Sequence, residues 1–367
     1  MSTLYRSLPS FATDYSGFLS IMHGLGGLMV VHDPSGCLGN YTNCDEPRWF
    51  HDPQSVYSTR LRELEAVLGD SRTSRELIVK EVRRSCPPFV CILGTSVPAL
   101  TGCDLADLAA QVEEETKVPC YAVDADGFHF YDSGIAKALS LLYRIMEPPA
   151  PKEPNCVNVL GMTPLDYSLY GECDKLTSMI EACGWHVGAF LGMGTDLKAV
   201  KAARKAEKNL VMTAAALPLA RRMEAEDGIA YFIGPPLGAS GSSLLSDFLQ
   251  GKTPMRTVEE LKRAPDTLII GEQLCANALR RALQAGGYAG RIAVASFFAM
   301  DSTQMQESDI PLKSEEQLRA LLSTDIYRHV IGDPLFRPLC VSQSFTPRPH
   351  PAVSSKLHWK ETPSQLG

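Results

Sequence analysis

The sequence predicts an α/β protein of three domains, each a parallel sheet flanked by helices, with a cleft between the domains. Strand-length apolar runs alternate with segments of helical spacing along most of the 367 residues. A stretch with four prolines in nine residues, 147–155, interrupts this alternation, because proline neither continues a helix nor fits a central strand. Repeated β–α units of this kind give Rossmann-like domains, in which ligands bind beyond the carboxyl ends of the strands.

The first domain is expected to span residues 1–150. Pro87 and Pro88 precede the apolar run FVCILG, which has the length and composition of a buried strand. Asp104 begins a segment whose apolar residues follow helical spacing. In chain order, the predicted elements are a helix at 57–84, a strand at 89–94, a helix from residue 104, a strand at 118–123 and a helix at 133–146.

The proline-rich stretch marks the boundary to a second domain at 151–252, which is followed by a third at 253–340. The last segment, 341–367, is rich in proline and is expected to be an extended tail over the surface or over a partner. The predicted strands of the second domain are 156–161, 209–214 and 229–233, and those of the third are 267–271, 291–298 and 327–332, with a helix at 273–286.

Charge and hydropathy exclude several classes of protein. A formal net charge of −7 argues against a general nucleic-acid binder, which would carry a basic face. The most apolar stretch, 17–31, contains His23 and four glycines and is too short and too interrupted to cross a bilayer. The start of the chain has no recognisable secretory signal. We therefore expect a cytoplasmic protein with neither a membrane nor a nucleic acid as partner.

Eleven cysteines in a reducing compartment are not expected to form disulfides. The sequence has no C-x-x-C pair and no zinc-ribbon spacing, so most of the cysteines are expected to be small buried residues and a few to be metal ligands. Those expected to be structural are Cys86, Cys91, Cys103, Cys120, Cys156, Cys275 and Cys340.

Three segments carry motifs in a characteristic order. Residues 32–37 read His-Asp-Pro-Ser-Gly-Cys, residues 58–70 lead by a helix and a strand to GTSVPALTGCDL at 94–105, and residues 209–238 run from Asn-Leu-Val to a Gly-Pro-Pro-Leu-Gly loop. Together they resemble the component 1 family of nitrogenase. The relatives of that family include dark-operative protochlorophyllide and chlorophyllide reductases and the nickel-sirohydrochlorin reductive cyclase.

The resemblance implies an oxidoreductase, namely a nitrogenase-like component 1 subunit of an ATP-dependent reductase. Cys37 stands where the family has an iron–sulfur ligand. Ser96 stands where a second ligand cysteine is usual, and it could supply an oxygen ligand. Thr213 replaces the cysteine that holds the catalytic cofactor of nitrogenase, so nitrogen fixation is not expected.

Cys44 is the best second thiolate candidate, because it follows Cys37 by seven residues in a polar segment with nearby Gly39. Clusters usually need about four protein ligands. Two cysteines from each of two chains, Cys37 and Cys44, would supply them across a two-fold axis and hold a [4Fe–4S] cluster. The alternative is that both are ordinary buried cysteines.

A glycine-rich loop opens the helix that follows residue 234. Gly234 and Gly238 leave amides exposed at a helix start, where an anion can bind, and by the resemblance this loop faces a substrate cavity between the domains, together with Thr213. A plain capping loop explains the same residues. The loop is not of the Walker type, since no Lys-Ser/Thr pair ends it.

The sequence has no nucleotide-binding motif, as the resemblance implies for a component 1 subunit. In the family, ATP is bound by a separate iron-protein reductase, and component 1 pairs with an identical or a paralogous subunit. The substrate would be a small molecule or a tetrapyrrole. Two alternatives remain open: a scaffold or carrier for metallocofactor assembly, and a metal- or tetrapyrrole-binding protein without a cluster.

Overall fold

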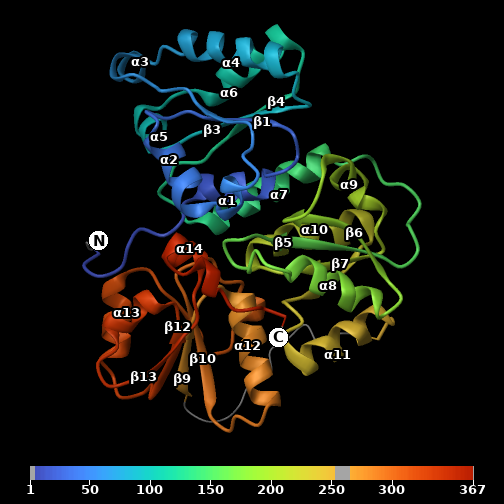
Figure 1. The fold of residues 1–367 in the computed structure, drawn as a ribbon, viewed down its shortest axis with the longest axis vertical. Helices are drawn as coiled ribbons and strands as arrows, with labels where there is room; N and C mark the ends of the chain where they lie inside the picture. The colour runs from blue at the N-terminus through green and yellow to red at the C-terminus, as the bar shows by residue number, and fades with distance from the viewer. Residues whose placement is uncertain (1–4, 253–264, 367) are drawn as a thin grey trace.

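Three separate parallel sheets form the framework of the molecule (Figure 1). The computed structural model describes residues 5–252 and 265–366. Within them, the sheets have four, four and five strands, and every strand pair inside a sheet is parallel. The predicted α/β fold of three helix-flanked parallel sheets is therefore confirmed. No described helix combines the length and apolar character that a membrane crossing requires.

The first sheet has the strand order β2-β1-β3-β4. Alternate residues of its strands point to opposite faces, so Leu28 and Val30 pack under α4 and α6, whereas Met29 and Val31 pack on the side of α1 and α7. The strands are β1 (Leu28–Val31), β2 (Val56–Ser58), β3 (Val90–Leu93) and β4 (Cys120–Val123), and the helices are α1 (Asp14–Met22), α2 (Gly36–Asn40), α3 (Glu63–Leu68), α4 (Arg72–Ser85), α5 (Ser96–Thr101), α6 (Leu105–Thr116) and α7 (Tyr131–Ile145).

The single helix predicted at 57–84 is wrong, because three elements occupy this range. Its start belongs to strand β2, and Arg60 has a φ of 54°, which no helix continues through. Gly69, with a φ of 65°, then ends α3 in the left-handed conformation before α4 begins. The sequence did not indicate the breaks at Arg60 and Gly69, because the segment is charged and amphipathic and neither arginine nor a lone glycine ends a helical pattern by itself.

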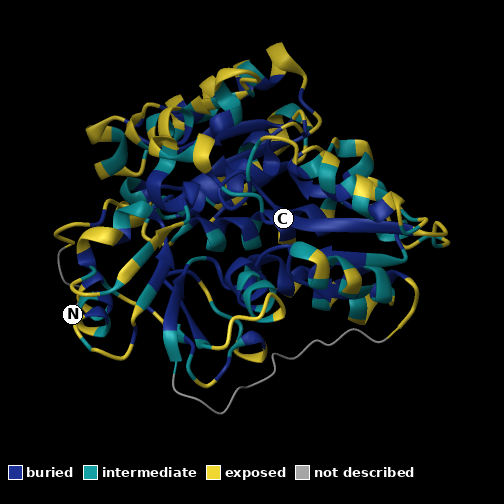
Figure 2. Cartoon of the chain, turned by 60° about the horizontal axis from the view of Figure 1, so that its bottom comes forward, coloured by how far each residue is buried: buried dark blue, intermediate teal, exposed yellow. Residues whose placement is uncertain are grey.

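The second sheet has the order β6-β5-β7-β8 and the third the order β11-β10-β9-β12-β13. Figure 2 shows that buried residues run through the sheets into the centre of the molecule, while exposed residues lie on outer helices and loops. The second unit contains β5 (Cys156–Met162), β6 (His186–Gly192), β7 (Lys208–Val211), β8 (Ala230–Ile233), α8 (Glu172–Glu181), α9 (Leu197–Ala202), α10 (Leu217–Asp227) and α11 (Gly238–Leu249). The third contains β9 (Pro265–Ile270), β10 (Arg291–Ser296), β11 (Ile310–Pro311), β12 (His329–Gly332), β13 (Ser344–Pro347), α12 (Gln273–Ala285), α13 (Glu315–Leu322) and α14 (Pro351–Ser354).

The final segment differs from the extended surface tail expected at 341–367. Residues 344–347 form β13, which pairs with β12 and extends the third sheet. Residues 350–354 are buried, and α14 lies between the first and third units in Figure 1. The physical reason is that Asp333 accepts hydrogen bonds from the His350 amide at 2.8 Å and the Ser354 hydroxyl at 2.7 Å, which fold this segment inward.

The first described residues are held by the third unit and not by their own sheet. One carboxylate oxygen of Glu315 accepts hydrogen bonds from the amides of Arg6, Ser7 and Leu8 at 2.9–3.0 Å. Next to them, the amide of Ala12 donates to the carbonyl of Ala352 at 2.9 Å. The two ends of the described chain therefore pack against each other.

His23, at the end of α1, makes the fold sensitive to acid. Its ring is buried, and its Nε2 lies 3.4 Å from a carboxylate oxygen of Asp52. Burial, and then the positive charge of Arg48, lower the pKa of His23 to about 4, although Glu46 and Asp52 oppose the shift. As the pH falls, the His23 side chain takes up a proton near pH 6.5 in the unfolded chain but only near pH 4 in the folded chain. The unfolding free energy therefore falls by about 3 kcal/mol as the pH falls from 6.5 to 4.

Replacing His23 with glutamine is expected to reduce the slope of the unfolding free energy against pH in this interval by the contribution of about one proton. The measurement is denaturant unfolding between pH 4 and pH 7. The control is the same change at His51, which is exposed. Equal slopes in the wild type and in His23→Gln would contradict the assignment.

Candidate functional site

The candidate site lies at the carboxyl edge of the first sheet. β1 leads to the turn that carries Cys37, β3 leads to Thr95 and Ser96 at the start of α5, and β4 leads to Gly127. The Thr95 hydroxyl donates to the His32 carbonyl at 3.0 Å, which ties the first two loops together. Parallel strands place their carboxyl ends at one edge, so these loops converge there.

Cys37 is half-buried and faces two hydroxyl groups. The backbone reaches it through Ser35, which has a left-handed φ of 96° and thus turns the chain sharply before α2. The side chains of Thr95 and Tyr15 hydrogen-bond the thiol and favour its ionised form. Burial, and then the charge of Asp33, raise the pKa of Cys37 despite these bonds. The thiol is therefore protonated near neutral pH, and a metal that bound the sulfur would displace this proton.

Cys44 is exposed on the next turn of the chain. It belongs to a π-helical turn, Tyr41–Asp45, which continues directly from α2. Asp45 anchors this turn, since its carboxylate accepts a hydrogen bond from the Ser16 hydroxyl at 2.6 Å, and burial raises its pKa to about 6. Single π-turns are rare and occur frequently at functional sites.

Large apolar side chains are exposed on α3 and α5. Leu64, Val67 and Leu68 on α3 and Leu100 on α5 are 68–76% exposed. α3 contacts α5, and α5 begins at Ser96. We call these four residues the α3–α5 apolar face. Exposed apolar groups of this kind mark surfaces that bind another protein.

The other residues singled out in the sequence lie elsewhere. Thr213 is buried, and its hydroxyl donates to the carbonyl of Gly161 at 3.2 Å. Gly238 begins α11, and its amide donates to the carbonyl of Leu366 at 3.4 Å. Gly234 lies near the Arg281 guanidinium. Thr213 and the two glycines are thus on different segments from Cys37, Cys44 and Ser96.

An open cleft of about 520 Å³ lies where the three units meet. Ala214, the residue after Thr213, lines it. Most of the remaining lining is apolar or aromatic and comes from all three units. The larger and charged side chains of this lining are Phe128, His129, Phe130, Asp132, Phe297, Met300 and Asp301.

A buried polar cluster joins the units beside a smaller cavity of about 30 Å³. Asp166 accepts a hydrogen bond from the Tyr131 hydroxyl and lies 2.9 Å from His350 Nε2. Burial, and then the neighbouring Asp166, raise the pKa of Glu272 to about 7. Sequence reasoning missed this cluster, because its members are up to 219 residues apart and none lies in a recognisable motif.

The segment after β1 carries two cysteines, the residue type that holds iron–sulfur clusters in proteins. Cys37 and Cys44 offer thiolates, the preferred ligands of iron in such clusters, and Ser96 offers a hydroxyl. The Tyr15 hydroxyl can donate a hydrogen bond to the Cys37 sulfur, and Thr95 lies beside it with its hydroxyl donated to the His32 carbonyl. Two thiolates are too few for a complete ligand set of about four, so a second chain would have to add the others.

Comparison with known proteins gives one consistent picture. The family model "Nitrogenase component 1 type Oxidoreductase" matches residues 15–265. A nitrogenase iron-molybdenum cofactor biosynthesis protein NifE of Methanosarcina barkeri is 24% identical over 289 residues, which are 74% of this chain and 61% of that protein. A nitrogenase molybdenum-iron protein alpha chain of Clostridium pasteurianum is 24% identical over 64% of this chain and 47% of its own.

Solved structures agree with the fold. A structure described as nitrogenase Cp1 at pH 6.5 superposes with a TM-score of 0.61 at 18% sequence identity, over 86% of this chain and 70% of the other. The chain spans less than two thirds of the length of the curated relatives named above.

Proposed function

The chain belongs to the nitrogenase component 1 type oxidoreductases, and from that premise we propose that it is a subunit of an ATP-dependent, nitrogenase-like reductase. It receives electrons from a separate iron-protein partner, which binds and hydrolyses ATP. The electrons enter through an iron–sulfur cluster at a subunit interface and reduce a small molecule bound between the three units. The observation that carries the proposal is the half-exposed Cys37 thiol at the edge of the first sheet where α5, which carries part of the exposed apolar face, also begins.

In this proposal Cys37 and Cys44 are the cluster ligands of this chain, and Ser96 is a third, oxygen donor. A bound [4Fe–4S] cluster would supply one-electron redox chemistry. The side chains of Tyr15 and Thr95 flank the Cys37 sulfur, and the Tyr15 hydroxyl donates a hydrogen bond to it. Hydrogen bonds to cluster sulfurs raise the reduction potential, so Tyr15 tunes the electron acceptor.

The partner subunit covers the α3–α5 apolar face. That face is mostly aliphatic, and it adjoins the segment in which the ligand set is incomplete. A second copy of this chain or a paralogous component 1 subunit would bury it and bring its own cysteines to the same place. Burial of the four side chains is favourable at roughly 25 cal/mol for each Å² of apolar surface.

The substrate occupies the inter-domain cleft. Its volume of about 520 Å³ is in the range of small-molecule sites, which run from about 300 to 1,000 Å³. Phe128, Phe130 and Phe297 offer flat apolar surfaces, and Asp132 and Asp301 offer proton-transfer or hydrogen-bonding groups. This lining suits a planar organic molecule with polar edges, such as a tetrapyrrole.

A second candidate function is a scaffold for metallocofactor assembly. The observation in its favour is that relatives such as the Methanosarcina barkeri protein are described as cofactor biosynthesis proteins. Against it, none of the residues that line the cleft in the described part of the chain is a cysteine, so a cluster has no thiolate to hold it there.

Anaerobic reconstitution with ferrous iron and sulfide tests both functions. For the reductase, we expect visible cluster absorption that is bleached by a nitrogenase-type iron protein only when MgATP is present. A scaffold would give the absorption without ATP-dependent bleaching. Protein that takes up no iron as a purified dimer, or with its paralogue, would exclude both functions.

The same experiment tests the interface with a matched pair of variants. Leu100→Asp places a charge in the α3–α5 apolar face and is expected to abolish both subunit pairing and cluster absorption. Val341→Asp is the control, because Val341 is 79% exposed but belongs to the third unit. Equal loss in both variants would argue against this face.

A further inference from the structure

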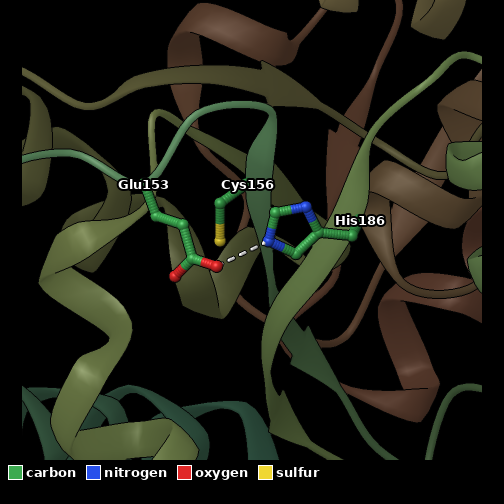
Figure 3. A group of neighbouring side chains, drawn as sticks. All are labelled: Glu153, Cys156 and His186. Atoms are coloured by element: carbon green, nitrogen blue, oxygen red, sulfur yellow. Dashed lines mark hydrogen bonds and ion pairs between the residues drawn. The ribbon is translucent and has the colours of Figure 1, made fainter.

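Three metal-ligating side chains converge at the amino end of the second sheet (Figure 3). Glu153 comes from the proline-rich connection, Cys156 begins β5 and His186 begins β6. A carboxylate oxygen, the sulfur and a ring nitrogen from these residues all lie within 4.8 Å of one another. His186 Nε2 lies 3.0 Å from Glu153 Oε1, within hydrogen-bonding distance. This group is remote in sequence from Cys37 and from the inter-domain cleft.

The backbone builds this arrangement in two steps. Cys156 and His186 are register partners on adjacent parallel strands, so their side chains project from the same face of the sheet. Asn155, with a left-handed φ of 56°, turns the chain so that Glu153 folds back over them. The amide of His186 donates to the Asn155 carbonyl at 2.9 Å and fixes the turn against β6.

The sheet leaves space for the sulfur. Gly188 follows His186 by two residues and faces the same side, and a Cβ placed there would lie 2.5 Å from the Cys156 Sγ. Cys156 is 3% exposed, whereas the side chains of His186 and Glu153 are 47% and 57% exposed. The Cys156 thiol therefore lies at the buried end of the group, and the Glu153 carboxylate and the His186 ring are accessible to solvent.

We propose that Glu153, Cys156 and His186 bind a divalent cation of the Zn²⁺ class in tetrahedral geometry, with water as the fourth ligand. Sulfur, imidazole nitrogen and carboxylate oxygen are the three donor types that zinc uses in proteins. Calcium and magnesium prefer oxygen ligands throughout, so this mixed set disfavours them. The metal replaces the proton of the Cys156 thiol, and that proton is released to solvent.

The carboxylates of Glu153 and Glu207 act electrostatically on Cys156, and their negative charge attracts a cation to this group.

A second group, Asp14, Asp126 and His129, has comparable spacing but a different chemistry. The two carboxylate oxygens of Asp14 already accept hydrogen bonds from the amides of Asp126 and Gly127 at 2.9–3.0 Å. The ammonium of Lys137 lies 3.2 Å from the same carboxylate. A cation at Asp14 would therefore compete with the Lys137 ammonium. Among the described residues, the ion pair given for the Glu153 carboxylate is the one with His186, itself a proposed ligand.

The test is a Co²⁺ titration of the metal-stripped full-length protein without oxygen. We expect one equivalent to give a sulfur-to-cobalt charge-transfer band and the visible bands of four-coordinate Co²⁺, both displaced by Zn²⁺. Cys156→Ser should abolish the charge-transfer band. Glu153→Gln and His186→Gln should each weaken Co²⁺ binding by more than about tenfold, since even the loss of groups that only orient a ligand costs 10- to 100-fold.

Two controls keep the test decisive. A Cys37→Ser, Cys44→Ser double variant should retain the band, which separates this site from any iron–sulfur site. Glu153 and His186 are exposed, so their variants should fold even if Cys156→Ser does not, and thermal unfolding followed by circular dichroism checks this. No charge-transfer band in the wild type, or undiminished Co²⁺ affinity in folded Glu153→Gln and His186→Gln, would overturn the proposal.

Discussion

Cys37→Ser is expected to abolish the iron–sulfur absorption of the anaerobically reconstituted protein and to reduce its bound iron to background. Serine keeps nearly the same shape but replaces a soft thiolate by a hydroxyl, which iron in such clusters binds poorly. Cys37 is half-buried between Tyr15 and Thr95, so no other thiol can take its place without a change in the turn after β1.

Cys44→Ser is expected to have a smaller effect, namely a cluster that forms but is lost more quickly in air. Cys44 is exposed, and solvent or a neighbouring group can replace it as a ligand. Cys183→Ser, in the second unit, is the matched control and should leave the iron content unchanged. Iron content and visible absorption are measured for the three variants. A Cys37→Ser protein that retains the wild-type spectrum would eliminate Cys37 as a ligand.

Asp309→Ala is expected to lower the unfolding free energy of the third unit by about 3–5 kcal/mol, the cost of removing one partner of a buried ion pair. The Arg280 and Asp309 side chains are 1% and 0% exposed, and two nitrogens of the guanidinium donate to the carboxylate at 2.6 and 3.0 Å. The same carboxylate accepts the amides of Val294 and Gln306 at 2.9 and 2.8 Å. The substitution leaves a buried positive charge and two amides without this acceptor.

The control is Asp247→Asn, which removes an exposed ion pair with Lys252 at 2.6 Å. An exposed pair of this kind contributes about 0–1 kcal/mol, so its loss should be small. Denaturant unfolding followed by circular dichroism gives both values. Similar losses in the two variants would show that the buried pair is not the dominant interaction in this unit.

Much of the fold could be predicted because several strands are continuous apolar runs. β3, β5 and β12 are short and largely buried, which is the pattern of parallel strands covered on both faces, whereas β4 has an exposed residue at Ala122. β6 was missed because its first half, His186 to Gly188, is partly exposed and includes a glycine, so its apolar pattern starts late. Tertiary pairing with β5 makes it a strand.

The sites were harder to predict, because they depend on contacts between distant parts of the chain. The turn that carries Cys37 could be singled out by its local motif. By contrast, His186 follows Cys156 by 30 residues, and only the strand register brings the two together. The sequence therefore predicted a structural role for Cys156, and nothing in the local pattern linked it to Glu153 and His186.

The packing of residues 6–12 against Glu315 and Ala352 has a consequence for biosynthesis. Residues 6–12 leave the ribosome long before residues 315 and 352, so they remain undocked while the first two sheets assemble. Its final closure follows the synthesis of residue 352 and depends on contacts of very high sequence separation, which form slowly. During that interval, Phe11 lacks its aromatic partners Phe297 and Phe336 of the third unit and presents apolar surface that a chaperone can recognise.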